Sequence, residues 1–449
     1  MTFSPASLKP YLPSLAEVSP AATWWVGLSG GLDSCVLLHA LRALQLPVRL
    51  QALHINHQIS VNADTWQAQC ADFCAHLQVA FCAVKVSVKN SGRGLEDAAR
   101  EARYRVFEEA IKPGDILFTA HHADDQSETL LLRLLRGTGP RGLAAMARVR
   151  PLAEGFLYRP LLDFSRAELE TYARAQGLSW VDDESNADDH YDRNYLRNQV
   201  LPLLRERWPA FAGKWQQTAE LCASNEALIE ELALQDLQLA DFQAAFIGTS
   251  ISLTYLQSLS PVRRHNLLRL WLREQKLATP EQAHLQQIER QVIAGRQDAE
   301  VQVGWGDVSL RVYRQRVFAL PVAELPVAES AGLAVSIEQP QGSIGLANGL
   351  QLKFEWCEAG VGHLLRPNLD HLHIRFRQGG ERCRPAGRAH SQTLKRLLQD
   401  CGLEPWLRDS LPLLYSGEQL VAVADLWVCE GYAVREGGYS LKYERKPNP

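Results

Sequence analysis

Residues Trp24 to Leu44 limit the folds open to this chain more than any other stretch. They read WWVGLSGGLDSCVLLHALRAL: an apolar run, then a turn of small residues, then leucines at helical spacing. This order predicts a strand, a tight loop and a helix whose apolar face covers a sheet. Because Ser29, Gly30 and Gly31 have little or no side chain, their backbone N–H groups can approach a ligand closely, at a helix start whose dipole favours negative charge. The loop is therefore a candidate phosphate site.

The loop also carries a carboxylate, Asp33, at the predicted helix start. There it can cap the helix backbone or hold a metal ion beside bound phosphates. A plain turn before a helix is the alternative, since glycine pairs are common there. The P-loop pattern, GxxxxGK followed by Ser or Thr, and the dinucleotide pattern GxGxxG are both absent from the loop. The six residues SGGLDS instead resemble the PP-loop of the ATP pyrophosphatase superfamily, whose members split ATP into AMP and pyrophosphate.

The length of the chain, 449 residues, predicts two or three domains rather than one core. A hydrophobic content of 46% with 22% charged residues argues against disordered and fibrous classes. No run of eighteen apolar residues occurs, and the N-terminus lacks a basic start followed by a long apolar region. We therefore expect neither secretion nor a membrane span, but a cytoplasmic protein.

Nine cysteines are scattered along the chain without any CxxC pair, so the spacing typical of zinc and iron–sulfur sites is absent. Cys70 and Cys74 lie one helical turn apart beside Trp66 and Phe73, on the apolar face of a predicted helix. We expect both to be buried, reduced thiols.

The first 136 residues alternate between strand and helix patterns, which predicts a parallel sheet with helices on its faces. After the first strand and helix, strands are predicted at residues 48–55, 79–86 and 115–120, and helices at residues 66–77, 95–111 and 126–136. Ligands of such sheets bind at the carboxyl ends of the strands.

Polar residues gather at those carboxyl ends. His54, Asn56 and His57 end the second strand, and His121, His122, Asp124 and Asp125 end the fourth. For any single histidine, a solvated or hydrogen-bonded structural role is the alternative, and Asp125 could simply cap its helix. Together with the loop, the clusters could bind Mg²⁺, neutralise a developing pyrophosphate or move protons.

Two charged segments follow. Residues 137–151, GTGPRGLAAMARVRP, are predicted to form an exposed basic loop able to meet a polyanion, with a solvated loop as the alternative. Residues 182–192 hold five aspartates and one glutamate, and then the chain turns basic at Arg193 and Arg197. This switch predicts an ordered, functional loop, with a disordered acidic loop as the alternative.

The remainder of the chain changes character twice. Helices are predicted at residues 215–239, 262–277 and 281–294, followed by two or three short strands within residues 301–320. Residues 321–349, rich in Ala, Pro, Gly and Ser, are predicted to be a linker with little structure. A mixed α and β unit is expected after it, with strands at residues 372–376 and 420–428 and a capped helix at residues 391–401.

The last unit carries a concentrated positive charge although the whole chain has a formal net charge of −4. Between Arg366 and Arg396, eight Lys or Arg stand against Asp370 and Glu381, a local net of +6. Such a patch predicts nucleic-acid binding, with a solvated surface as the alternative.

Several motifs together, in this order, resemble the tRNA(Ile)-lysidine synthetase family. They are SGGLDS, HINH, LEDAAREARY, TAHHADDQSETLLLRLLRGTG, DDESN and RNYLRN, across residues 24 to 208. The later stretch GERCRPAGRAHSQTLKRLLQDCGLEPWLRDSLPLLY is similar to the terminal RNA-binding domain of that family. One departure is Asn56, where the family often has an acidic residue, so a role for this position stays open.

The resemblance implies a fold and a reaction. The fold is a Rossmann-like parallel-sheet PP-loop domain of the N-type ATP pyrophosphatases (residues 1–215), a mainly helical domain (216–325) and a mixed α+β tRNA-binding domain with its linker (326–449). The reaction ligates L-lysine to C2 of the wobble cytidine in the CAU anticodon of the minor isoleucine tRNA. The cytosine oxygen attacks the α-phosphate of ATP, pyrophosphate leaves, and the amine of lysine displaces AMP.

The resemblance also implies roles for residues of this chain. Asp33 and Asp125 would hold Mg²⁺, His122 and Arg103 would stabilise transferring charge, and Asn194 and Arg197 would hold the target base or lysine. The predicted ATP-binding residues are Ser29, Gly30, Gly31, Leu32, Asp33 and Ser34. The predicted tRNA-binding residues are Arg377, Arg382, Arg384, Arg388, Lys395 and Arg396.

Two rival interpretations stay open at this point. A PP-loop tRNA thiolase would share the ATP chemistry, but that class usually needs paired cysteines or a cluster, and the chain has no CxxC. A non-catalytic RNA-binding protein would have a degenerate nucleotide loop, whereas SGGLDS and HHADD are intact. The sequence leaves open the oligomeric state, the lysine-binding residues and the means of rejecting methionine tRNA.

Overall fold

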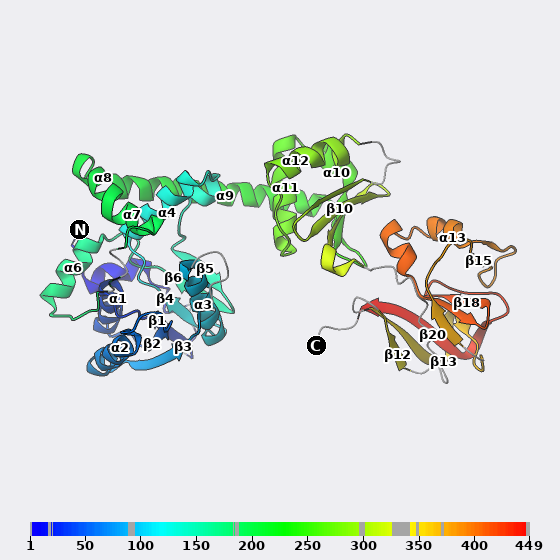
Figure 1. Cartoon of the computed structure of the whole chain (residues 1–449), viewed down its shortest axis with the longest axis horizontal. Helices are drawn as coiled ribbons and strands as arrows, with labels where there is room; N and C mark the ends of the chain where they lie inside the picture. Colours follow the sequence, from blue (N-terminus) through cyan, green and yellow to red (C-terminus); the bar gives the residue numbers. More distant parts are fainter. Residues whose placement is uncertain are drawn as a thin grey trace. The chain divides into compact units, whose positions relative to one another are not determined.

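The structure, a computed structural model, describes residues 2–16, 19, 21–88, 95–182, 184, 188–295, 301–325, 342–346, 350–369 and 372–445. The chain divides into two compact units, Met1–Ile229 and Glu230–Pro449. The labelled elements of both are drawn in Figure 1. The predicted division into three domains at residues 215 and 325 stays a prediction.

Unit 1 is built on one six-stranded sheet with the strand order β3-β2-β1-β4-β6-β5. Five strands are parallel, and β5 pairs antiparallel to β6 at the edge. The predicted parallel sheet is therefore confirmed. The strands are β1 (Thr23–Gly27), β2 (Arg49–Asn56), β3 (Ala80–Lys85), β4 (Ile116–Phe118), β5 (Val149–Leu152) and β6 (Gly155–Tyr158).

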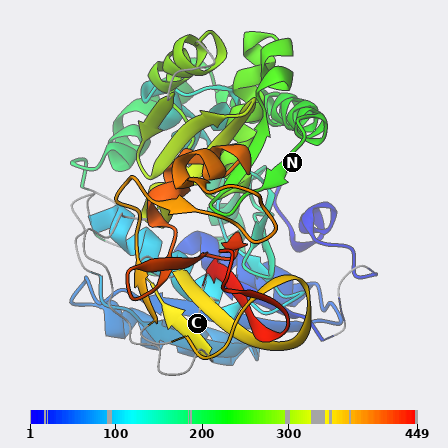
Figure 2. The same cartoon turned by 90° about the vertical axis from the view of Figure 1, so that its right-hand side faces the viewer.

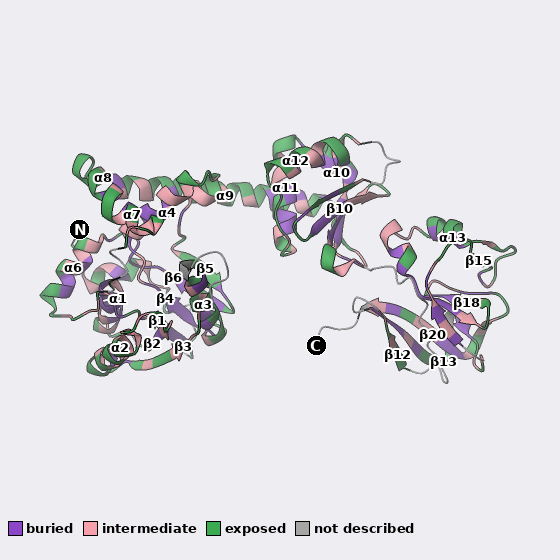
Figure 3. Cartoon of the chain, in the orientation of Figure 1, coloured by how far each residue is buried: buried purple, intermediate pink, exposed green. Residues whose placement is uncertain are grey.

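Helices cover both faces of this sheet. The larger apolar cluster joins β1 to α1 (Leu32–Ala43), α2 (Ala63–Leu77) and α6 (Arg166–Ala175), and it includes the fully buried Trp24. The smaller cluster packs α3 (Leu95–Ala110) through Val106 and Phe107 on the opposite face. In Figure 3 the buried residues of unit 1 gather on the strands and on the helix faces toward them.

Two local features predicted from the sequence, the buried cysteines of α2 and the capped start of α6, are present in the structure. Cys70 and Cys74 are buried on α2, as predicted. Burial raises the pKa of the Cys70 thiol to about 12 and that of Cys74 to about 11, so both are neutral thiols. At the start of α6, Ser165 accepts from the Glu168 backbone N–H, and the Glu168 carboxylate accepts from the Ser165 backbone N–H, which confirms the capping interaction expected there.

One buried carboxylate anchors the end of the sheet that lies away from the strands' carboxyl ends. Asp115, directly before β4, accepts hydrogen bonds from the backbone N–H of Thr23 (2.7 Å), the indole N–H of Trp25 (3.2 Å) and the backbone N–H of Lys112 (3.2 Å). It thereby fixes the first residues of β1 to the start of β4.

The expectation of a basic loop at residues 137–151 was wrong in part. The segment contains helix α5 (Pro140–Leu143) and most of strand β5, because a hairpin with β6 extends the sheet there. After α6 the chain forms α7 (Asp192–Tyr195), a π-helical turn (Leu196–Val200), α8 (Leu201–Arg207) and the long helix α9 (Phe211–Leu239). In the acidic segment, residues 183 and 185–187 lie outside the described residues.

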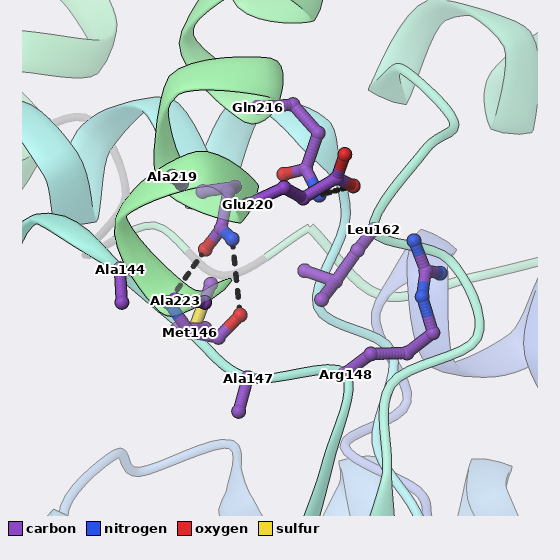
Figure 4. A pocket seen from close by; sticks show the side chains of 10 residues that line it. Ala144, Met146, Ala147, Arg148, Leu162, Gln216, Ala219, Glu220 and Ala223 are labelled. Carbon is purple, nitrogen blue, oxygen red and sulfur yellow. Dashed lines mark hydrogen bonds between the residues drawn. The ribbon is translucent and has the colours of Figure 1, made fainter. Parts of the chain in front are cut away.

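The first turns of α9 contact the segment before β5. Ala219 packs with Leu130 of α4 (Ala123–Leu135) and with Ala145. A small pocket lies beside this contact, lined among others by Met146, Arg148, Leu162, Gln216 and Glu220 (Figure 4). The pocket contains none of the residues predicted for the active site.

Unit 2 begins with the end of α9, three further helices and a five-stranded sheet. The helices are α10 (Leu253–Ser258), α11 (Pro261–Glu274) and α12 (Gln282–Ile288), and the sheet has the order β7-β8-β11-β10-β9. Strands β9 (Gln302–Trp305), β10 (Val308–Tyr313) and β11 (Arg316–Pro321) confirm the strands expected within residues 301–320. The short strands β7 (Gln243–Ala244) and β8 (Thr249–Ser252) were not predicted.

The last part of unit 2 holds three small sheets. β12 (Gly342–Gly345), β13 (Leu350–Leu365) and β20 (Ala433–Arg445) form the first, and β13 and β20 run side by side in Figures 1 and 2. β14 (Leu372–Arg375), β17 (Leu413–Ser416), β18 (Gln419–Val423) and β19 (Trp427–Val428) form the second. β15 (Arg382–Cys383) and β16 (Gln392–Thr393) precede helix α13 (Leu394–Asp400).

Two expectations for this part need correction. The strand expected at residues 420–428 is two antiparallel strands, β18 and β19, with a turn between them. The expectation of a linker with little structure at residues 321–349 was wrong for Gly342–Gly345, which form β12 because β13 offers it an edge. Residues 326–341 and 347–349 lie outside the described residues. Among the described residues no helix is long and apolar enough to cross a lipid bilayer.

Candidate active site

The loop between β1 and α1 is held by its own small side chains. The Ser29 hydroxyl lies 3.1 Å from the Ser34 hydroxyl and accepts from the Gly31 N–H (3.3 Å). The Ser34 hydroxyl accepts from the Ser29 N–H (3.2 Å) and donates to the Gly31 carbonyl (3.0 Å). This network fixes the loop before any ligand binds, at the start of α1.

Gly30 adopts a conformation that requires glycine. Its φ is +89°, and a Cβ atom on it would lie 2.9 Å from the sulfur of Cys70. Its carbonyl accepts a hydrogen bond from the Val181 N–H (2.9 Å), which ties the loop to the segment after α6. Neighbouring Gly31 has φ −72°, and its Cβ would meet only ordinary contacts.

His122 brings the loop and the end of β4 together. Its Nε2 lies 3.6 Å from Asp33 Oδ2 and 3.4 Å from Asp125 Oδ2. Burial lowers the pKa of His122, but Asp125, Asp33 and Asp124 outweigh burial and raise the pKa to about 9. The ring is therefore an imidazolium at neutral pH, a positive charge directed at the phosphate loop.

The two predicted metal ligands differ in their freedom to bind an ion. Asp33 Oδ1 is buried and has no hydrogen-bond partner, so a lone pair there is available to a cation. Both oxygens of Asp125 are engaged: Oδ1 with Arg193 (3.3 Å) and Arg197 (3.1 Å), and Oδ2 with the backbone N–H of His122 (3.1 Å). Within the described residues no group of three or more His, Cys, Asp and Glu is arranged to hold a metal ion. A magnesium ion held by one carboxylate and substrate phosphates fits Asp33.

Behind His122 lies a cluster of two acids and two arginines around the buried Glu128. Glu128, one turn beyond Asp125 on α4, is fully buried and accepts from Arg193 Nε and Arg197 Nε, both at 2.7 Å. Desolvation raises the pKa of Asp125, but His122, Arg193, His121 and Arg197 outweigh it and hold the pKa well below its usual range. Asp125 is therefore ionised, and the two acids hold α7 and the π-helical turn onto α4 through Arg193 and Arg197.

Sequence reasoning gave no role to Glu128 or Arg193. The available signal was spacing, since Glu128 lies three residues after Asp125 and Arg193 four residues before Arg197, which places each pair on one helix face.

Three further residues singled out from the sequence form hydrogen bonds with other polar groups. Arg103, exposed on α3, lies with Nη2 3.5 Å from His57 Nε2. The amide of Asn194 donates to the Asp188 carbonyl (2.9 Å). Asn56 is buried and donates to Asp64 (2.8 Å) and Gln67 (3.0 Å), so its contacts are those of a structural residue.

Comparisons with known proteins match nearly the whole chain. Family models for a PP-loop domain, a TilS substrate binding domain and a TilS substrate C-terminal domain match residues 7–204, 251–318 and 372–443. A tRNA(Ile)-lysidine synthase of an Enterobacter species is 39% identical over 95% of this chain and 98% of its own length. That of Coxiella burnetii is 35% identical over 99% of this chain and 97% of its own length.

The chain belongs to the tRNA(Ile)-lysidine synthase family. It is therefore a ligase with an ATP-binding PP-loop domain, as the sequence predicted. The roles of individual residues stay predictions.

In this lysidine synthase family member, the predicted tRNA-binding residues fall within the matched C-terminal domain. Five of the six are exposed around β15 and the start of α13: Arg382, Arg384, Arg388, Lys395 and Arg396. Arg377 differs, because it is half-buried and forms a salt bridge with Asp409 (2.9 Å). Five exposed cations are therefore available to a polyanion.

Proposed function

We propose that the protein ligates L-lysine to C2 of the wobble cytidine of the isoleucine tRNA with a CAU anticodon, consuming ATP to AMP and pyrophosphate, in the cytoplasm, where tRNA is used. The observation that carries the proposal is the convergence of the SGGLDS loop with His122, at 3.6 Å from Asp33. Family membership supports the choice of tRNA as substrate.

The residues present fit the first step. Backbone N–H groups of Ser29 to Ser34 would bind the phosphates at the start of α1. Attack of the cytosine oxygen on the α-phosphate releases pyrophosphate, and the His122 imidazolium would neutralise the charge that develops on it. Mg²⁺ held by Asp33 and the phosphates would neutralise further charge. Asp125, on the other side of His122, would add negative charge near the ion.

The second step needs a site for the amine nucleophile and a way out for AMP. Arg197 and Asn194 remain our candidates for the target base or lysine, although Arg197 is paired with Glu128 and Asp125. The wobble base must leave its stack to reach the α-phosphate, at a cost of about a few kcal/mol that is smaller in a loop than in a duplex. An anticodon loop is a substrate of that kind.

The reaction is tested by one incubation of the purified protein with ATP, Mg²⁺ and an isoleucine tRNA transcript bearing CAU. AMP should form only when lysine and this tRNA are both present, and the modified nucleoside should contain lysine by mass spectrometry. A methionine tRNA transcript with the same anticodon is the matched control and should yield no product.

Sulfur transfer is the alternative reaction of a PP-loop enzyme. Product with cysteine or sulfide, and none with lysine, would overturn the proposal. Cys35, directly after the loop, is buried, and burial raises the pKa of its thiol to about 12, which disfavours a sulfur-transfer role for it.

A further inference from the structure

Three arginines from separate parts of unit 1 surround one tyrosine. Arg100 and Tyr104 lie on α3, Arg150 lies on β5, and Arg159 follows β6. The guanidinium carbons of Arg100 and Arg150 each lie 5.0 Å from the centre of the Tyr104 ring. The fold therefore gathers three positive charges at one place.

Arg159 is the buried member of this arginine cluster. Its exposed fraction is 4%, and one guanidinium nitrogen donates to the Ala147 carbonyl. Its Nε is buried and has no hydrogen-bond partner. A buried charged donor without a partner is rare in proteins, because burial removes its hydration and nothing replaces it.

Among the side chains that the structure describes, which do not include Glu96 of α3, no acid forms a salt bridge with Arg100, Arg150 or Arg159. Tyr104 is the hydrogen-bond partner of Arg150 and Arg159 in this cluster. Burial lowers the pKa of Arg159, Tyr104 partly restores it, and Arg150 and Arg100 lower it further. The three cations therefore repel one another in a site that an anion would stabilise.

The cluster lies near the candidate active site but not at the phosphate loop. Arg159 follows the carboxyl end of β6, and the sheet order places β6 two strands from β1, a separation of about 10 Å. Arg159 and Arg100 also act on His121 at the end of β4. Burial lowers the pKa of His121 to about 3, Asp125 opposes this shift, and Arg159, Arg193 and Arg100 add to it.

We propose that Arg100, Arg150 and Arg159 bind a backbone phosphodiester of the tRNA beside the nucleotide that enters the active site. The proposal rests on the proposed function for its tRNA substrate. A nucleotide removed from its stack must be held through its backbone, and arginine forks match phosphate oxygens. Phosphates of ATP are the other source of the same chemistry, but their loop lies two strands away.

The test uses Arg100→Gln, Arg150→Gln and the double variant in the full chain, with Arg105→Gln as the matched control. Arg105 lies exposed on the same helix α3, so its substitution removes the same charge from a different place. Affinity for the CAU isoleucine tRNA is measured over a series of salt concentrations, and ATP affinity is measured separately. Each variant of the cluster should weaken tRNA binding and reduce the slope of log affinity against log salt by about one, with ATP affinity unchanged.

Three results would overturn the site. The first is a double variant whose tRNA salt slope equals that of wild type. The second is an Arg105→Gln variant whose slope changes as much as that of the cluster variants. The third is weaker ATP binding with an unchanged tRNA slope, which would assign the cluster to ATP. Arg100 is exposed, so its variant keeps the test available if Arg150→Gln fails to fold. A wild-type protein that binds no tRNA would instead refute the proposed function.

Discussion

At the scale of single residues, the phosphate loop depends on one backbone conformation. Gly30 alone in the SGGLDS loop combines a positive φ with a close neighbour, the sulfur of Cys70. Asp33 contributes the second special feature, a buried oxygen without a partner. Both residues were singled out from the sequence because the loop is contiguous and its chemistry is local.

Gly30→Ala should destabilise the fold by about 2 kcal/mol, since an alanine in the left-handed region costs about 1–2 kcal/mol before any contact with Cys70. Urea unfolding measures the change. Gly31→Ala is the matched control, because its φ is negative and its Cβ meets no close atom, so its free energy of unfolding should stay within about 0.5 kcal/mol of wild type. Equal losses in the two variants would contradict the role given to Gly30.

Asp33→Asn should lower the rate of pyrophosphate release by about a hundredfold or more, because it removes charge from the site of phosphoryl transfer while keeping the side-chain volume. A pyrophosphate assay measures the rate, and filter binding should show nearly unchanged tRNA affinity. Asp72→Asn, an exposed carboxylate of α2, is the control. Turnover of Asp33→Asn equal to that of the control would remove Asp33 from the site.

At the scale of elements, the π-helical turn Leu196–Val200 follows α7, and the two together carry the arginines that pair with Glu128 and Asp125. Arg193 lies on α7 and Arg197 in the turn, and both reach Glu128 and Asp125 of α4. Extra residues in a helical turn often occur at functional sites. The sequence could not predict this pairing, because the partners lie more than sixty residues apart and depend on how α7 packs on α4.

Glu128→Ala should reduce the free energy of unfolding by about 3–5 kcal/mol, since it leaves two arginines without their buried acceptor. Thermal and urea unfolding measure the change. Glu128→Gln keeps one acceptor oxygen of similar shape and should lose less. A change below about 1 kcal/mol for the alanine variant would show that the cluster does not hold α7 to α4.

At the scale of the whole molecule, the sequence predicted strands β1 to β4 of the sheet in unit 1, the apolar faces of α1 and α2, and the strands within residues 301–320. It missed β5 and β6, which pair with each other at one edge of the sheet in unit 1. It missed β8, because four residues are too short for a pattern, and β12, because its partner β13 decides its conformation. It read β18 and β19 as one strand, since both are apolar and the turn between them lacks glycine and proline.

We expect the basic surface around β15 and α13 to bind tRNA phosphates and so to make tRNA affinity depend on salt. With about six phosphate contacts, affinity should fall by roughly 10³ between 50 and 200 mM salt. Charge reversal at Arg382 and Arg384 should weaken tRNA binding and flatten this dependence, as measured by binding titrations. Arg290→Glu with Lys276→Glu, two exposed cations elsewhere in unit 2, is the control for net charge. An unchanged affinity and slope in the first pair would remove the surface from the tRNA site.

The position of Asp115 predicts which substitutions in this protein would lower its amount and which would lower its activity. It fastens β1 to β4 at one end of the strands, whereas Asp33 and His122 meet at the other end. A mutational scan could measure two quantities for each substitution: the cellular abundance of the protein, and growth that depends on the isoleucine tRNA. Substitutions at the two ends of the same strands should then differ in which quantity they lower. Substitutions at Asp115 would lower abundance, while substitutions at Asp33 would leave a full amount of inactive protein.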